Sequence, residues 1–183
     1  MKWSIKKLIA ASFFAAAIFG LAFILGNAIT TAFGPGMSGF VSTIFTTLLI
    51  IISAKITLSR GIFTFTVTLF TILAIPTNLF GPAGVQKIII GLITGLSYDI
   101  VWELLKRKKH SLKIAAFVAT AISLVLVYFL MKYLNHPKIN SLASIIFWAP
   151  LVYGALGTIG AIIGESIYEK YLKNSSYVKF IQE

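Results

Sequence analysis

The stretch from Gln86 to Leu105 constrains this chain more than any other, because it is mostly apolar and is followed directly by a basic run, Lys-Arg-Lys-Lys, at 106–109. About twenty residues at 1.5 Å per residue give a helix long enough to cross a bilayer. A basic cluster of this kind strongly resists translocation, so it keeps its end of the helix on the cytoplasmic side. The stretch therefore predicts a transmembrane helix whose C-terminal end lies in the cytoplasm.

The composition places the whole chain in the same class. Hydrophobic residues make up 58% of the 183-residue chain and charged residues only 11%, which excludes an ordinary soluble domain. Thr64, Thr66 and Thr68 alternate as in a strand, but one open strand in lipid would leave its backbone unpaired, so we expect a helix there. Six apolar segments are predicted to be membrane helices, at about 8–26, 40–58, 62–79, 86–105, 112–134 and 143–168.

The basic residues predict the orientation of these six helices. With both ends of the chain inside, thirteen of the sixteen Lys and Arg residues lie in cytoplasmic segments, and only Lys87, Lys132 and Lys138 lie at outer ends. The predicted fold class is all-α: a polytopic membrane protein, a bundle of six transmembrane helices with cytoplasmic N- and C-termini. Residues 1–168 form a single transmembrane domain in this prediction, and residues 169–183 form a cytoplasmic tail.

Small residues recur on one face of the first helix, at Ala11, Ala15 and Ala22. Small side chains allow another helix to approach closely. Packing within the chain and docking of a partner subunit both explain this face, and the sequence leaves the two open. A second narrow stripe of small residues, Gly157, Gly160 and Gly164, follows the last helix.

Four charged residues lie within the predicted helices: Lys55, Asp99, Glu103 and Glu165. Charges at membrane depth are costly and persist mainly where they face protein, water or a partner charge. For Asp99 and Glu103 we expect ionic pairing with Lys55, Lys6 or Arg60. Coupling to a partner subunit and acid/base chemistry are the alternatives.

Enzymes, metal proteins and nucleic-acid-binding proteins are not expected. The chain has no Cys, its two histidines, His110 and His136, fall on opposite sides of the membrane, and no metalloprotease, hydrolase or nucleotide-binding motif occurs. We therefore predict no cofactor and no metal site. The basic residues form short clusters between apolar segments, which membrane topology explains better than binding of nucleic acid.

Amides and aromatic rings gather near the outer helix ends, without any carboxylate. Such groups suit a small polar ligand that contains a ring, although Tyr and Trp also act as interface anchors. The segment 27–39, rich in Gly, Pro and Thr, is predicted to be a loop or a broken helix and is the candidate lid over this ligand. The candidate substrate-binding residues are Asn27, Phe33, Asn78, Gln86, Lys87, Tyr128 and Trp148.

The chain resembles the substrate-binding S components of energy-coupling factor (ECF) vitamin transporters. The resemblance is carried by the six-helix pattern, by Ala11-x-x-x-Ala15, by the FGPG sequence at 33–36 and by the block GPAGVQKIIIGLITGLSYDIVWELLKRK, and it is most like the YkoE-like hydroxymethylpyrimidine/thiamine group. It implies a prokaryotic plasma-membrane protein that binds a vitamin from outside. It also implies a transmembrane coupling subunit, docked through Ala11 and Ala15, and two cytoplasmic ATPase subunits as partners.

Two points of interpretation stay open at this level. Thiamine is a cation, yet the outer region has lysines and no acid, so a neutral pyrimidine or an anionic vitamin suits the local charge at least as well. The alternative function is a small homo-oligomeric channel or scaffold. A channel requires polar residues along one face through the whole bilayer, and the apolar middle of these helices favours transport.

Overall fold

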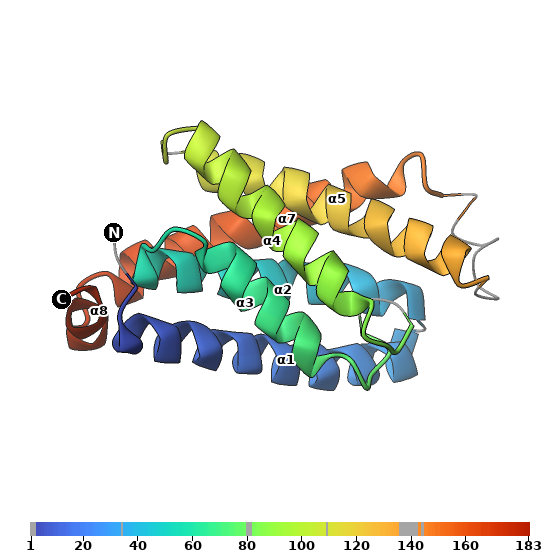
Figure 1. Ribbon diagram of the computed structural model, residues 1–183, viewed down its shortest axis with the longest axis horizontal. Coiled ribbons are helices and arrows are strands. Elements are labelled where there is room, and N and C mark those ends of the chain that lie inside the picture. Colours follow the sequence, from blue (N-terminus) through green and yellow to red (C-terminus); the bar gives the residue numbers. More distant parts are fainter. Residues whose placement is uncertain (1–2, 34, 80–81, 109, 136–142, 144) are drawn as a thin grey trace.

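The computed structural model describes residues 3–33, 35–79, 82–108, 110–135, 143 and 145–183, and the regular structure in these ranges is helical (Figure 1). The helices are α1 (Ile5–Phe33), α2 (Pro35–Thr57), α3 (Ile62–Leu73), α4 (Lys87–Leu104), α5 (Ser111–Tyr133), α7 (Ala149–Ile167), the π-helix η1 (Tyr168–Leu172) and α8 (Ser176–Gln182).

Six of these helices pack into a closed ring. The main contacts run from α1 to α2, then α7, α5, α4 and α3, and from α3 back to α1. Four spans in the described part are long and apolar enough to cross a membrane: Ile5–Ala32, Ser38–Thr57, Ser111–Tyr133 and Ala149–Leu172. The helix α4 has 18 residues but is not among these four spans, because it carries three charged residues, Lys87, Asp99 and Glu103.

The third helix is shorter than the sequence predicts. We expected it to reach about Leu79, but α3 has 12 residues and ends at Leu73, so it is only about 18 Å long. Proline lacks an N–H and disfavours a helical conformation in the residue before it, so Pro76 accounts for the early end. Turns follow from Ala74 onward.

The Gly/Pro-rich segment at 27–39 is a break between two helices. The helix α1 continues to Phe33, and α2 begins at Pro35. Proline is well suited to the first position of a helix, because its missing N–H would have no partner there. Of the two alternatives, a loop or a broken helix, the structure therefore has the second.

Small residues set the spacing between neighbouring helices. A Cβ added at Gly95 of α4 would lie 2.5 Å from Thr64 Cα of α3, and one at Gly160 of α7 would lie 2.5 Å from the Ile44 carbonyl oxygen of α2. At Gly164 the same test gives 2.7 Å to the Leu48 carbonyl oxygen. The glycine stripe of the last helix thus packs within the chain.

The alanine face of α1 is also used within the chain. Ala11 and Ala15 are 0% exposed, Ala22 is buried, and all three belong to the main apolar core. The helix α1 packs on α2 and α3. Ala11 and Ala15 thus face other helices of the same chain. Docking of a coupling subunit through these residues stays a prediction.

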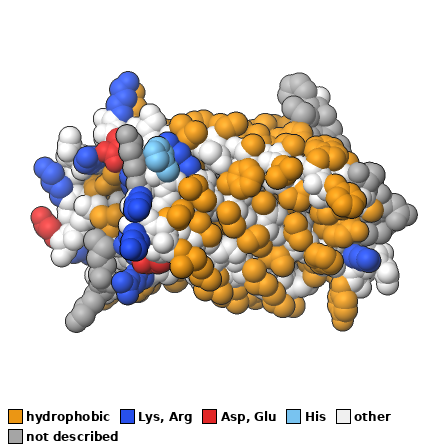
Figure 2. All heavy atoms as spheres, turned by 90° about the horizontal axis from the view of Figure 1, so that it is seen from above, with side chains coloured by type: hydrophobic (Ala, Val, Ile, Leu, Met, Phe, Trp, Pro, Cys, Tyr) orange, Lys and Arg blue, Asp and Glu red, His pale blue; other side chains and the backbone are white. Residues whose placement is uncertain are grey.

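Both chain ends lie at the same end of the bundle (Figure 1). On the face that Figure 2 shows, most Lys and Arg side chains gather at this end, and a broad apolar surface covers the rest. The C-terminal segment is anchored here: Val178 and Ile181 are buried, and Gln182 Nε2 donates to the carbonyl oxygens of Lys55 (3.3 Å) and Ile56 (3.2 Å). The tail therefore packs on the bundle.

A matched pair of glycine substitutions tests the close contacts. We expect Gly95→Ala to lower the thermal unfolding temperature in detergent, because overpacking costs about 1–3 kcal/mol. The control is Gly20→Ala on α1, where an added Cβ meets nothing within 4 Å. It should be neutral or slightly stabilising, since alanine favours a helix. Equal stability of the two variants would contradict the proposed role of Gly95.

Candidate ligand-binding cavity

A cavity of about 760 Å³ lies inside the ring of helices. Its walls come from the C-terminal halves of α1 and α5, the N-terminal parts of α2 and α7, the inner faces of α3 and α4, and the turn at 76–79. The chain ends lie at the other end of the bundle. The cavity thus occupies the half of the molecule that is remote from the basic end.

Hydroxyl and amide side chains supply the polar part of the wall. Thr43 Oγ1 donates to the Gly39 carbonyl (2.8 Å), and Thr120 Oγ1 lies within hydrogen-bonding distance of the carbonyls of Ala116 (2.7 Å) and Tyr153 (3.1 Å). Bonds of this kind satisfy a hydroxyl within a helix bundle. The polar residues along the wall include Asn27, Thr30, Ser38, Ser42, Thr43, Thr46, Thr47, Thr77, Asn78, Thr94, Thr120 and Ser123.

Aromatic rings form part of the remaining wall, including Phe23, Phe70, Tyr98 and Tyr153. The Tyr98 ring stacks on Phe63, with 4.9 Å between ring centroids and 13° between planes. One face of Tyr98 is thus covered by protein. The sequence prediction named neither tyrosine.

Lys87 holds the turn that forms another part of the wall. Its side chain is 0% exposed, and Nζ donates to the carbonyl oxygens of Ala74 (2.9 Å) and Thr77 (2.6 Å). Residues 76–79, in and next to that turn, line the cavity, whereas Lys87 does not. Lys87 therefore positions the wall from behind, and its contact with a ligand stays a prediction.

Of the other predicted substrate-binding residues, some line the cavity and others do not. Asn27 and Asn78 line the cavity. Gln86 Nε2 donates to the Ala83 carbonyl (3.2 Å) in its own loop. Tyr128 packs edge-on against its neighbour Phe129, and Trp148 is 48% exposed. These three residues are not part of the described cavity wall, and the side chain of Phe33 lies outside the described part.

The sequence did contain a signal for the hydroxyl wall. Ser38, Ser42, Thr43, Thr46 and Thr47 follow one another at intervals of one, three or four residues, which places them on one face of α2. The signal is weak, because single Ser and Thr residues are common in membrane helices and carry no charge.

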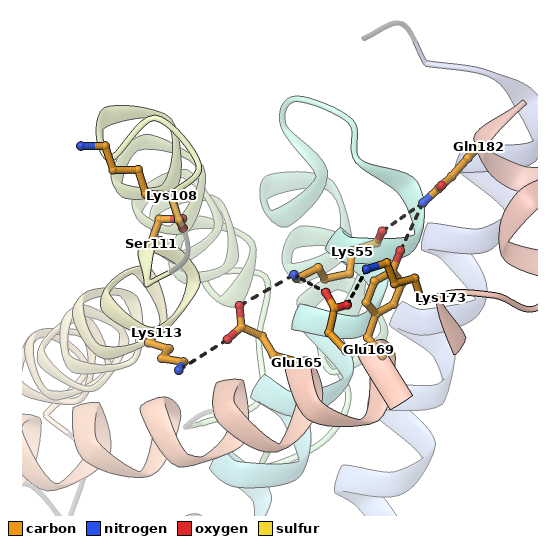
Figure 3. A network of polar contacts seen from close by, with 9 residues as sticks. Lys55, Lys108, Ser111, Lys113, Glu165, Glu169, Lys173 and Gln182 are labelled. Atoms are coloured by element: carbon orange, nitrogen blue, oxygen red, sulfur yellow. Dashed lines mark hydrogen bonds and ion pairs between the residues drawn. The ribbon is translucent and has the colours of Figure 1, made fainter. Parts of the chain in front are cut away.

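Lys55, Asp99, Glu103 and Glu165 lie toward the other end of the bundle, and only some of them pair as predicted. Lys55 Nζ lies 3.3 Å from Glu169 and 3.9 Å from Glu165, and Lys113 Nζ lies 3.8 Å from Glu165 (Figure 3). The expected pair of Lys55 with Asp99 is therefore wrong. The acids of the last helix and of η1 occupy Lys55 instead.

Asp99 binds the start of α3. Its Oδ2 accepts hydrogen bonds from the Thr64 backbone N–H (2.8 Å) and the Thr64 hydroxyl (2.6 Å). A carboxylate is stabilised at a helix N-terminus, where backbone N–H groups lack partners. Glu103 does face Arg60, at 3.8 Å, and also binds Arg107. Glu103 thus has one of the predicted partners, Arg60, whereas Asp99 binds Thr64.

Comparison with known proteins gives a fold and no family assignment. No protein-family model and no curated protein matches the sequence. The chain is a helical, multi-pass membrane protein. A solved structure described as "Crystal structure of an S-component of ECF transporter" shares its fold, with a TM-score of 0.58 and 17% sequence identity over 98% of this chain and 93% of that chain.

Replacement of Lys87 tests the clamp on the 74–77 turn. We expect Lys87→Met to lower stability by about 1–3 kcal/mol, because hydrogen bonds from a charged donor are lost, and to speed amide hydrogen exchange at 74–79. The exposed Lys132→Met on α5 is the control. If the two variants unfold at the same temperature and exchange alike at 74–79, Lys87 does not hold this turn.

A double-variant experiment tests the new assignment of Asp99. We expect Asp99→Ala to destabilise by about 1–3 kcal/mol, because the Thr64 donors lose their acceptor. Lys55→Met should not rescue it, since Lys55 pairs with other acids and the two effects should add. Thermal unfolding of both single variants and of the double variant measures this. A rescue would contradict this assignment and support the predicted pairing of Lys55 with Asp99.

Proposed function

We propose that this chain is the substrate-binding membrane subunit, an S component, of an ECF-type importer, and that its cavity holds a small vitamin or vitamin precursor. One observation carries the proposal: a cavity of about 760 Å³ inside a closed ring of helices whose fold is also that of a solved S component. Ligand sites commonly have volumes of about 300–1,000 Å³. This role is that of a transporter subunit and not of an enzyme.

The position of the cavity supports binding from outside. In the proposed orientation five helices of the ring, and α3 together with the turn that follows it, cross the membrane. The basic end that holds both termini faces the cytoplasm, and the cavity lies in the outer half. Short α3 reaches only part of the way, and the turn at 74–79 continues it toward the outer side. The membrane in question is the prokaryotic plasma membrane.

The wall composition supports a ligand that contains a pyrimidine ring, the part that thiamine and hydroxymethylpyrimidine share. Tyr153 offers a ring face, and Asn27 and Asn78 offer amide hydrogen bonds. Stacking on rings and bonding to amides are ordinary ways to hold a pyrimidine. The proposal leaves the particular vitamin to experiment.

Energy for uptake would come from partners: a transmembrane coupling subunit and two cytoplasmic ATPase subunits. Docking through Ala11 and Ala15 would require α1 to move away from α2 and α3, because those residues are buried between helices. Exposed apolar residues on the other face of α1, such as Ile9 and Phe13, need no such movement. That face is the simpler place for a partner helix.

The alternative of a channel or scaffold has less support. Fully buried apolar side chains close the inner part of the ring, among them Ile18, Ile51, Ala54, Phe63 and Ala115. A water-filled pore needs a polar path through the whole bilayer. Among the described residues, the packed core interrupts such a path through a single chain on the cytoplasmic side of the cavity.

Filling the cavity tests the proposed function. We expect one or more compounds in a panel of water-soluble vitamins and precursors to raise the unfolding temperature of the purified protein, because a ligand stabilises the state that binds it. Ser42→Trp should abolish this shift by occupying the cavity.

Ser97→Trp is the matched control. Ser97 lies on α4, its hydroxyl donates to the Ile93 carbonyl (2.7 Å), and it does not line the cavity. The variant should keep the ligand-induced shift. If no compound stabilises the protein, or if Ser42→Trp responds as the unmodified protein does, the cavity is not a ligand site.

A further inference from the structure

The cavity wall carries no charged side chain among the residues that the structure describes. Its polar members there are hydroxyls and carboxamides, together with backbone groups. Four of the five acids are engaged elsewhere: Asp99 with Thr64, Glu103 with Arg60 and Arg107, and Glu165 and Glu169 with lysines. The fifth, Glu183, is exposed at the C-terminal end of the chain and does not line the cavity. The wall therefore offers hydrogen bonds and ring faces, and no counterion.

Lys87 is the cation next to this wall, and its ammonium is already engaged. Nζ lies 2.9 Å from the Ala74 carbonyl oxygen and 2.6 Å from that of Thr77, and the side chain is fully buried. To reach an anionic ligand it would have to give up the bonds that hold the turn at 74–77. The geometry thus gives Lys87 a positioning role, and the described part of the cavity wall has no cation.

A buried charge without a partner is costly, which decides the class of ligand. Transfer of an unpaired ion into a low-dielectric site is costly, and contact of a cation with an aromatic ring recovers only part of that cost. One face of Tyr98 is already stacked on Phe63. Ring contacts alone would not offset the desolvation of a cationic ligand.

A second, independent observation concerns Thr94. This residue lines the cavity, is 5% exposed, and its Oγ1 is buried without a hydrogen-bond partner among the described residues. A buried hydroxyl without a partner costs free energy, so such groups usually meet a ligand or water. Thr94 is thus a wall residue whose hydroxyl has no partner among the described residues, and a rotation about its Cα–Cβ bond would turn that hydroxyl toward a ligand.

From these observations, and on the basis of the proposed function, we infer that the cavity selects an uncharged, ring-containing polar compound and that Thr94 hydrogen-bonds to it. A ligand with a fixed positive charge, such as thiamine, or with a carboxylate is rejected for lack of a counterion. The neutral pyrimidine precursor is accepted on the same grounds. Discrimination of this kind arises because the wrong ligand would leave a buried charge unpaired.

Matched ligands test the charge rule. The purified protein is titrated with pairs that share a ring: hydroxymethylpyrimidine and thiamine, nicotinamide and nicotinate, and biotinamide and biotin, within a larger panel of neutral, cationic and anionic vitamins. We expect the strongest rise in unfolding temperature from a neutral compound. If a charged compound stabilises most, the inference fails and the proposed function stands; if no compound stabilises, the proposed function fails as well.

A pair of isosteric substitutions tests Thr94. Thr94→Val should raise the dissociation constant of the strongest stabiliser by about 5- to 150-fold, measured by calorimetric titration. Thr68→Val is the control, because the Thr68 hydroxyl is also buried without a partner among the described residues but does not line the cavity. It should change the constant by less than about twofold. Equal effects of the two substitutions would overturn the assignment of Thr94.

Discussion

Close contact between helix backbones is the constraint on which this structure depends. Apolar side chains gain little by leaving lipid for a protein interior, so membrane helices associate through tight packing and hydrogen bonds. Gly95 of α4 meets the backbone of α3, and Gly160 and Gly164 of α7 meet the backbone of α2. These contacts hold two sides of the ring at short distance. The cavity lies inside the ring of helices that these contacts hold together.

Polar groups complete what packing alone does not fix. Asp99 accepts the free N–H and hydroxyl of Thr64 and so joins α4 to the start of α3, while Lys87 joins the start of α4 to the turn after α3. Polar contacts thus join α3 and α4 near both ends of α3. Because the turn at 76–79 is also cavity wall, the shape of the site depends on a buried ammonium that does not line it.

Charge is strongly segregated along the bundle. Ion pairs such as Lys55–Glu169 and Lys113–Glu165 join α2, α5 and the C-terminal helices toward the end that holds the termini (Figure 3). The cavity, in the other half, has hydroxyls, amides and rings in its described wall. This division fits a subunit that keeps a basic face toward the cytoplasm and holds an uncharged ligand in the outer half, as we propose.

The sequence by itself determined the class and much of the helix pattern, because apolar length and basic clusters are local properties that the bilayer selects directly. It predicted the stretch of α4, a loop or broken helix within 27–39, and the position of Asn27 and Asn78 near one end of the helices. It did not determine how side chains on different helices meet. Lys55 pairs with Glu169 and not with Asp99, Ala11 and Ala15 face the core, and Lys87 turns toward the backbone of residues 74–77. Only the tertiary structure decided these partners, because each depends on the order of helices around the ring and on their rotation, which helical periodicity along one segment does not contain.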